Sequence, residues 1–149
     1  MLKEVQRINA DQMDRFVKKI TDTLWVLKDK KIGVLGLAFK QNTDDVRSSP
    51  AIDLCQRLLN GGATLRVHDP KAMDKTKSIL PNVTYVDDMN AVAEGCDALV
   101  VATEWDEFKQ LDLARAKKLM TAPLFFDGRN LFDPAEMEKL GWIYKSVGR

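Results

Sequence analysis

The stretch KIGVLGL, residues 31–37, decides the fold of this chain. It is a short apolar run that closes on a glycine, which is typical of a strand buried in a parallel sheet. A polar stretch over residues 40–49 follows it. Ser49-Pro50 then predicts the start of a helix, with the serine as its cap and the proline in its first turn. A buried strand, a loop and a helix form the first part of a crossover unit.

The rest of the chain repeats this alternation. Further strands are predicted over residues 63–68, 83–86, 97–102, 124–126 and 142–147, and helices over residues 51–59, 88–94, 113–120 and 134–140. Strands that alternate with helices imply crossover connections, which are right-handed. The sequence therefore predicts an α/β fold: a Rossmann-like, doubly wound, mostly parallel sheet of about six strands, preceded by a long N-terminal helix.

The N-terminal helix is predicted over residues 2–27. Its apolar residues recur at steps of three and four, with one wider gap: Leu2, Val5, Ile8, Phe16, Val17, Ile20, Leu24 and Leu27. The helix either lies across the sheet of its own domain or offers an interface to a second chain or another domain. We favour the interface, because the apolar face is longer than one helix partner would cover.

The composition excludes several classes of protein. The 149 residues include 23 basic and 22 acidic side chains, so the net charge of +1 argues against nucleic-acid or anionic-membrane binding. A hydrophobic share of 45% suits one globular domain with a single core. No apolar run approaches the roughly 20 residues of a membrane span, and the first residues are too polar for a secretory signal. Two cysteines without disulfide or metal-ligand spacing favour a reduced, cytoplasmic location.

Ligands of such sheets bind outside the carboxyl ends of the strands, where the strand order reverses. Four segments are then candidates: the turn after Leu37, Asp69, residues 103–105 and residues 127–130. Asp69 stands where a dinucleotide fold places its ribose-binding acid, but Asp-Pro also ends a strand, and the structural interpretation is favoured. Arg129 can point into the cleft from its Asp-Gly-Arg turn; the alternative is a surface arginine paired with Asp127 or Asp133, and its position favours function.

The turn after the first strand lacks the dinucleotide fingerprint Gly-x-Gly-x-x-Gly. The three glycine positions hold Gly36, Ala38 and Gln41, so the main chain is poorly suited to bind a pyrophosphate. The following loop offers side chains instead, and its Lys40 and Arg47 suit phosphates. The alternative, equally open, is a solvated loop whose charges pair with each other.

Other residues that often carry chemistry are interpreted as structural. His68, the only histidine, ends an apolar strand with no serine or cysteine motif beside it. Cys55 and Cys96 have no partner base and are interpreted as small buried hydrophobic residues. Trp105 and Phe108 are spaced for the core or an interface.

Longer stretches resemble a known family. The strings KIGVLGLAFKQNTDDVRSSPAIDL, GCDALVVATEWDEF, FFDGRN and GWIYKSVGR are similar to the C-terminal domain of the UDP-glucose/GDP-mannose dehydrogenase family. QRINADQM resembles the end of the long helix that joins the two halves of those enzymes. Within the family, these sequence strings are most similar to the UDP-glucose 6-dehydrogenases. Membership of the groups that act on UDP-N-acetylhexosamine or GDP-mannose stays open.

The resemblance implies a division of labour. In the family an N-terminal domain binds NAD and carries a catalytic cysteine, a central helix forms the dimer, and the C-terminal domain binds the UDP part of the substrate. Residues 1–30 then correspond to the end of the central dimerisation helix and residues 31–149 to the C-terminal UDP-sugar-binding domain. The whole enzyme would oxidise UDP-glucose to UDP-glucuronate in two NAD-dependent steps, and this chain alone is expected to be inactive. No catalytic and no metal-binding residue is expected in it.

Four residues take roles from the resemblance. Phe39 and Lys40 match a substrate-contacting pair, in which the lysine would hydrogen-bond the sugar and phosphate region. Arg129 matches a substrate-contacting arginine. Arg47 matches an arginine that reaches NAD, although Ser48 departs from the glutamate usual after it. Two other classes of function stay open beside the dehydrogenase: a stand-alone Rossmann-like sensor of a nucleotide or small molecule, and an interaction domain that acts through its long helix.

Overall fold

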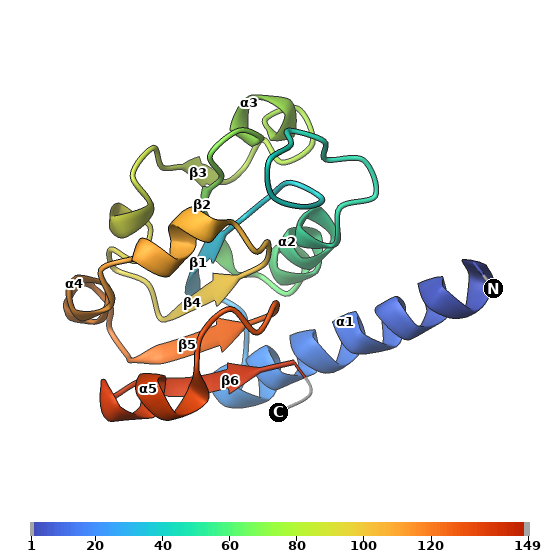
Figure 1. Cartoon of the computed structure of the whole chain (residues 1–149). Helices are drawn as coiled ribbons and strands as arrows, with labels where there is room; N and C mark the ends of the chain where they lie inside the picture. The colour runs from blue at the N-terminus through green and yellow to red at the C-terminus, as the bar shows by residue number, and fades with distance from the viewer. Residues whose placement is uncertain (1, 148–149) are drawn as a thin grey trace.

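The computed structural model describes the backbone of residues 2–147 and the side chains of residues 11–147. Its centre is a six-stranded sheet in the order β3-β2-β1-β4-β5-β6, and every pair of neighbouring strands is parallel. The strands are β1 (Lys31–Leu35), β2 (Thr64–His68), β3 (Thr84–Tyr85), β4 (Ala98–Val101), β5 (Leu124–Asp127) and β6 (Ile143–Ser146). The predicted open, parallel sheet is thereby confirmed (Figure 1).

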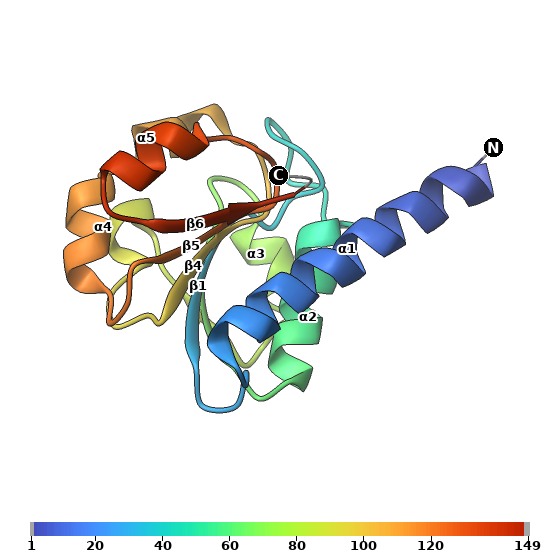
Figure 2. The same ribbon diagram turned by 90° about the horizontal axis from the view of Figure 1, so that it is seen from below.

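Helices cover both faces of the sheet. They are α1 (Leu2–Leu24), α2 (Pro50–Asn60), α3 (Met73–Thr76), α4 (Leu113–Leu119) and α5 (Pro134–Lys139), with 3-10 turns η1 (Met89–Ala91) and η2 (Asp106–Gln110). Figure 2 shows α1, α2 and α3 on one side of the sheet and α4 and α5 on the other. The fold is therefore doubly wound, as the alternation of strands and helices predicted.

The register of the sheet aligns the carboxyl ends of β1, β2, β4 and β5 at one edge. Leu35 at the end of β1 pairs with His68 of β2 and Val101 of β4, and Val101 in turn pairs with Asp127 of β5. The chain leaves β1 toward β2 and later returns to β4 on its other side, so the strand order reverses between β1 and β4. The residues that follow these four strands consequently lie side by side at the switch point.

The start of α2 differs from its prediction in one respect. Ser49 occupies the cap position and Pro50 begins the helix, but the serine side chain makes no capping hydrogen bond. Its hydroxyl instead donates to the carbonyl oxygen of Leu37 at 2.8 Å. A buried serine beside the turn after β1 therefore fixes that turn and not the helix end.

Two short elements also differ from the sequence-based expectation. The helix predicted over residues 88–94 is only the 3-10 turn η1, and α3 was not predicted. Both are too short for an apolar periodicity to appear in the sequence. Asp88, which caps η1, accepts a hydrogen bond from the backbone N–H of Asn90 at 2.9 Å.

The C-terminal part of α1 packs on the domain itself. Phe16, Ile20 and Leu24 are buried, and the Lys19 ammonium donates to the carbonyl oxygen of Ser146 at the end of β6. The helix ends at Leu24, three residues before the predicted end, and Trp25 follows it with a φ of 72°. In both ribbon views the N-terminal part of α1 projects beyond the domain. The intramolecular interpretation thus holds for the C-terminal part, and Leu2, Val5 and Ile8 lie outside the described side chains.

Within the described part of the chain, no helix is both long and apolar enough to cross a membrane.

Candidate ligand site

The turn after β1 depends on a glycine. Gly36 has a φ of 106°, and its N–H donates to the carbonyl oxygen of His68 at 2.8 Å. A Cβ atom built on it would lie 2.5 Å from Thr103 Cβ and 2.6 Å from the Thr103 nitrogen. The main chain at the end of β1 therefore closely approaches the segment after β4 at this point.

Asp69 ties three of the four strand ends together. Its side chain is fully buried and accepts five hydrogen bonds. The donors are the backbone N–H groups of Leu37, Ala38, Lys71 and Ala72, at 2.8 to 3.0 Å, and the indole N–H of Trp105 at 3.2 Å. The structural interpretation of Asp69 is confirmed, because both of its oxygens are already occupied.

The same contacts test whether this turn fits a dinucleotide. In a dinucleotide fold the amides of the glycine turn face a pyrophosphate. Here the N–H groups of Leu37 and Ala38 both donate to Asp69 Oδ2. The turn after β1 therefore does not fit the pyrophosphate of NAD.

A cavity of about 300 Å³ opens beside this turn and brings two predicted site residues together. Phe39 lines it from the loop after β1, and Arg129 lines it from the turn after β5. Phe39 is 46% exposed, which is unusual for a phenylalanine and leaves its ring available to a ligand. The remaining lining comes from the described parts of α1, α2 and the strand ends: Gln12, Met13, Phe16, Pro50, Leu54, Ala102, Gly128 and Val147.

Arg129 is held at both ends. Its backbone N–H donates to Asp127 Oδ1 at 3.1 Å, and its guanidinium forms a two-point ion pair with Glu104. The Glu104 carboxylate raises the pKa of Arg129, and the hydrogen bonds from Arg129 lower the pKa of Glu104. The alternative prediction that the guanidinium pairs with Asp127 or Asp133 is wrong, because its partner is Glu104. Asp127 is instead buried and accepts from the Tyr144 hydroxyl at 2.6 Å.

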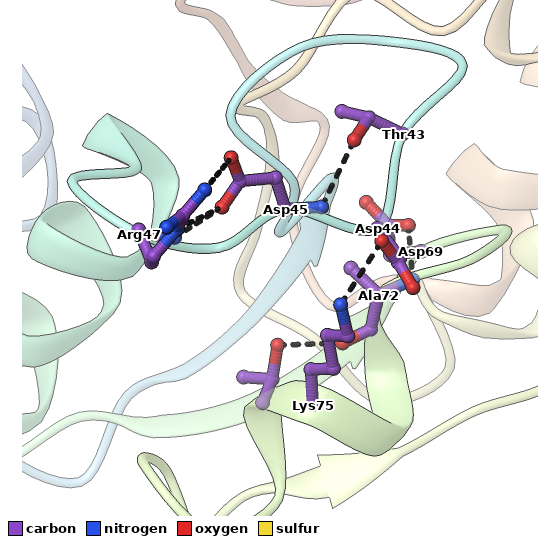
Figure 3. A network of polar contacts seen from close by, with 8 residues as sticks. Thr43, Asp44, Asp45, Arg47, Asp69, Ala72 and Lys75 are labelled. Atoms are coloured by element: carbon purple, nitrogen blue, oxygen red, sulfur yellow. Dashed lines mark hydrogen bonds and ion pairs between the residues drawn. The ribbon is translucent and has the colours of Figure 1, made fainter.

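The loop over residues 40–49 pairs two of its four charged side chains with each other, so the interpretation of a loop with internally paired charges holds for that pair only. Arg47 contacts both oxygens of Asp45, at 3.2 and 3.3 Å, and its side chain is 90% exposed. Asp44 pairs with Lys75 of α3 at 3.2 Å (Figure 3). Lys40 is exposed and has no hydrogen bond or ion pair to any residue that the structure describes. Lys40 and Arg47 are not among the lining residues of the cavity.

The residues interpreted as structural are buried. Trp105 and Phe108 lie in the core, and the Phe108 ring packs 6.2 Å from the ring of His68. His68 Nδ1 lies 2.8 Å from the carbonyl oxygen of Val86 and donates to it, because a carbonyl can only accept. Among the residues with described side chains, no group of three or more His, Cys, Asp or Glu could hold a metal ion.

Both thiols are expected to be unreactive in the folded chain. Burial raises the pKa of Cys55 to about 12 and that of Cys96 to about 11. Because the thiolate is the reactive form, a disulfide reagent at neutral pH should label neither cysteine in the native state and both in denaturant. Rapid labelling of one thiol without denaturant would contradict the structural interpretation.

The fold and the site define a class of protein: a Rossmann-like α/β domain whose ligand cavity opens at the carboxyl ends of β1, β4 and β5. Residues 33–134 match the family model described as "UDP-glucose/GDP-mannose dehydrogenase family, UDP binding domain". The chain belongs to this family.

Similar proteins agree with the family and show how much of it the chain spans. The chain is 40% identical to the UDP-glucose 6-dehydrogenase TuaD of Bacillus subtilis, covering all of this chain and 32% of that protein. It is 42% identical to a UDP-glucose 6-dehydrogenase of Rhizobium meliloti, covering 83% of this chain and 28% of that one. The chain thus spans about a third of the length of these relatives.

A solved structure agrees with the fold. A UDP-glucose dehydrogenase from Pyrobaculum islandicum superposes with a TM-score of 0.80 at 34% identity, over 98% of this chain and 31% of that one. A GDP-mannose dehydrogenase from Pseudomonas aeruginosa gives a TM-score of 0.66 at 28% identity, over 85% of this chain and 30% of that one.

Proposed function

We propose that this chain binds the UDP part of a UDP-sugar, as the C-terminal part of an NAD-dependent UDP-glucose 6-dehydrogenase. The observation that carries the proposal is the pair of Phe39 and Arg129 on one cavity at the carboxyl ends of the central strands. The family membership of the chain supports the same ligand class.

The chemistry of the cavity suits a nucleoside diphosphate ester. Arg129 presents a planar guanidinium, which matches the oxygens of a phosphate better than a point charge does. Phe39 offers an exposed aromatic face to the apolar parts of the ligand. Lys40 follows Phe39 in the chain, is exposed and has no internal partner among the described residues, so it can supply a second positive charge to the ligand. Two cations from different strand ends would contact the diphosphate from two sides.

The chain supplies binding and not oxidation. Its cysteines are buried, and the turn after β1 does not fit NAD. In the proposed whole enzyme another domain binds NAD, and Arg47 reaches toward it after exchanging Asp45 for the cofactor. Dimerisation through α1 and a cytoplasmic location complete the proposal.

Titration calorimetry with UDP-glucose tests the binding site. Removing the guanidinium by Arg129→Ala should weaken binding about 30-fold, because a charged hydrogen-bond donor to phosphate is lost. Lys40→Ala should weaken it about five-fold, since an exposed lysine is a screened point charge. Lys118→Ala on α4 changes the net charge equally and should have no effect. Equal affinities in the wild type, Lys40→Ala and Arg129→Ala would defeat the proposal.

A further inference from the structure

Glu104 lies at the carboxyl end of β4 between two anchored residues. Thr103 and Trp105 are both buried. The Thr103 hydroxyl donates to the carbonyl oxygen of Ala38 at 2.8 Å, and the Trp105 indole donates to Asp69. The backbone on both sides of Glu104 is therefore fixed against the turn after β1, so its carboxylate starts from a defined position.

From this position Glu104 holds one edge of the Arg129 guanidinium. The Nε and Nη2 atoms of Arg129 donate to the two carboxylate oxygens, with Nη2 to Oε1 at 2.8 Å. Nη1 has no hydrogen-bond partner among the described residues. Arg129 lines the cavity, whereas Glu104 is not among its lining residues. The ion pair thus occupies one edge of the guanidinium and leaves Nη1 to a ligand.

We propose that Glu104 is a positioning residue for the anion, acting through Arg129, and that it is not a competitor for the guanidinium. The proposal rests on the proposed function, because it assigns the free edge of Arg129 to the diphosphate. A free arginine must lose several side-chain rotamers on binding, and a side chain already held loses fewer. Glu104 would therefore raise affinity without touching the ligand.

An opposing effect has to be weighed. Glu104 also cancels the charge of Arg129, which by itself would weaken the attraction for an anion. The side chain of Arg129 is 32% exposed and that of Glu104 is 38% exposed, so solvent screens the electrostatic effect. Orientation of the guanidinium does not depend on screening. At an ionic strength of about 0.15 M, where the Debye length is about 8 Å, the positioning effect should exceed the charge effect.

Calorimetry with UDP-glucose at that ionic strength gives the first test. Glu104→Ala should weaken binding about five-fold, as expected for one side chain that must be ordered again. Glu104→Gln should be intermediate, because it keeps one acceptor. Glu107→Ala is the matched control: it removes the same charge from the neighbouring 3-10 turn, and no hydrogen bond or ion pair of Glu107 to a described residue exists. Its affinity should equal that of the wild type.

A double-mutant cycle separates positioning from an independent effect. In the Arg129→Ala background, the additional Glu104→Ala change should not weaken binding further, because the residue on which Glu104 acts is gone. An equal loss in both backgrounds would overturn the proposal, and so would tighter binding by Glu104→Ala in the wild-type background.

An NMR measurement on the unliganded chain keeps this proposal separate from the proposed function. The ¹⁵Nε–¹H signal of Arg129, assigned by its loss in Arg129→Ala, should show slow solvent exchange in the wild type and Glu107→Ala, and fast exchange in Glu104→Ala. Absence of UDP-glucose binding to the wild type would sink the proposed function, and this signal would then decide the positioning claim. If the solvent exchange of this Nε–H were unchanged in Glu104→Ala, the proposal that Glu104 positions Arg129 would be overturned.

Discussion

Asp69→Ala is expected to lower the free energy of unfolding by about 4 kcal/mol, because five N–H groups, four of them buried, lose a charged acceptor together. Asp69→Asn should cost nearly as much. Both carboxylate oxygens accept from N–H groups, so either orientation of the amide sets its NH₂ against N–H donors. Urea unfolding followed by circular dichroism measures the loss.

Asp87→Ala is the matched control for this change. Asp87 is exposed, and no hydrogen bond or ion pair of it to a described residue exists. Its removal should change stability by less than about 0.5 kcal/mol. If Asp69→Asn were as stable as the wild type, the buried carboxylate would not hold the strand ends together, and the account of the turn after β1 would be wrong.

Gly36→Ala should lower the free energy of unfolding by a comparable amount, for a conformational and a steric reason. The φ of 106° is unfavourable for any L residue, and the new Cβ would lie 2.6 Å from the Thr103 nitrogen, which is main chain and cannot rotate away. The two effects together should cost about 4 kcal/mol. Thermal unfolding of the purified variant measures it.

Gly95 separates the conformational part of this cost from the steric part. It also has a positive φ, of 71°, but the nearest atom to an added Cβ is the flexible Lys31 ammonium at 3.9 Å. Gly95→Ala should therefore cost only about 1 kcal/mol. Equal losses at the two glycines would show that the close approach of the segments after β1 and β4 contributes nothing.

The fold followed from the sequence because its central strands are almost purely apolar. KIGVLGL and the run before Thr103 can only be buried between two layers, and crossover handedness then fixes the topology. The short elements could not be predicted in the same way. α3 has four residues and η1 three, and neither gives a periodic pattern. Their conformation depends on contacts such as the hydrogen bonds from the Lys71 and Ala72 amides to Asp69.

The position of the candidate site could be predicted from the sequence, but the ion-pair partner of Arg129 could not. The rule on strand ends selected Arg129 and the segment around Glu104, and the structure brings both to one edge. The sequence offered Asp127 and Asp133 as partners of Arg129 because they are near in the chain. Glu104 is 25 residues away, and only the register of β4 against β5 brings it into reach. Arg47 shows the reverse case, since a neighbour two residues away pairs with it.

Asp69 makes this edge of the sheet self-sufficient. Where related folds leave amide hydrogens open for the pyrophosphate of a diffusing cofactor, this polypeptide carries its own negative group in that cradle. These amides are not available to the pyrophosphate of a free dinucleotide. In a protein that contains two domains of this architecture, such a difference can direct each nucleotide ligand to its own domain.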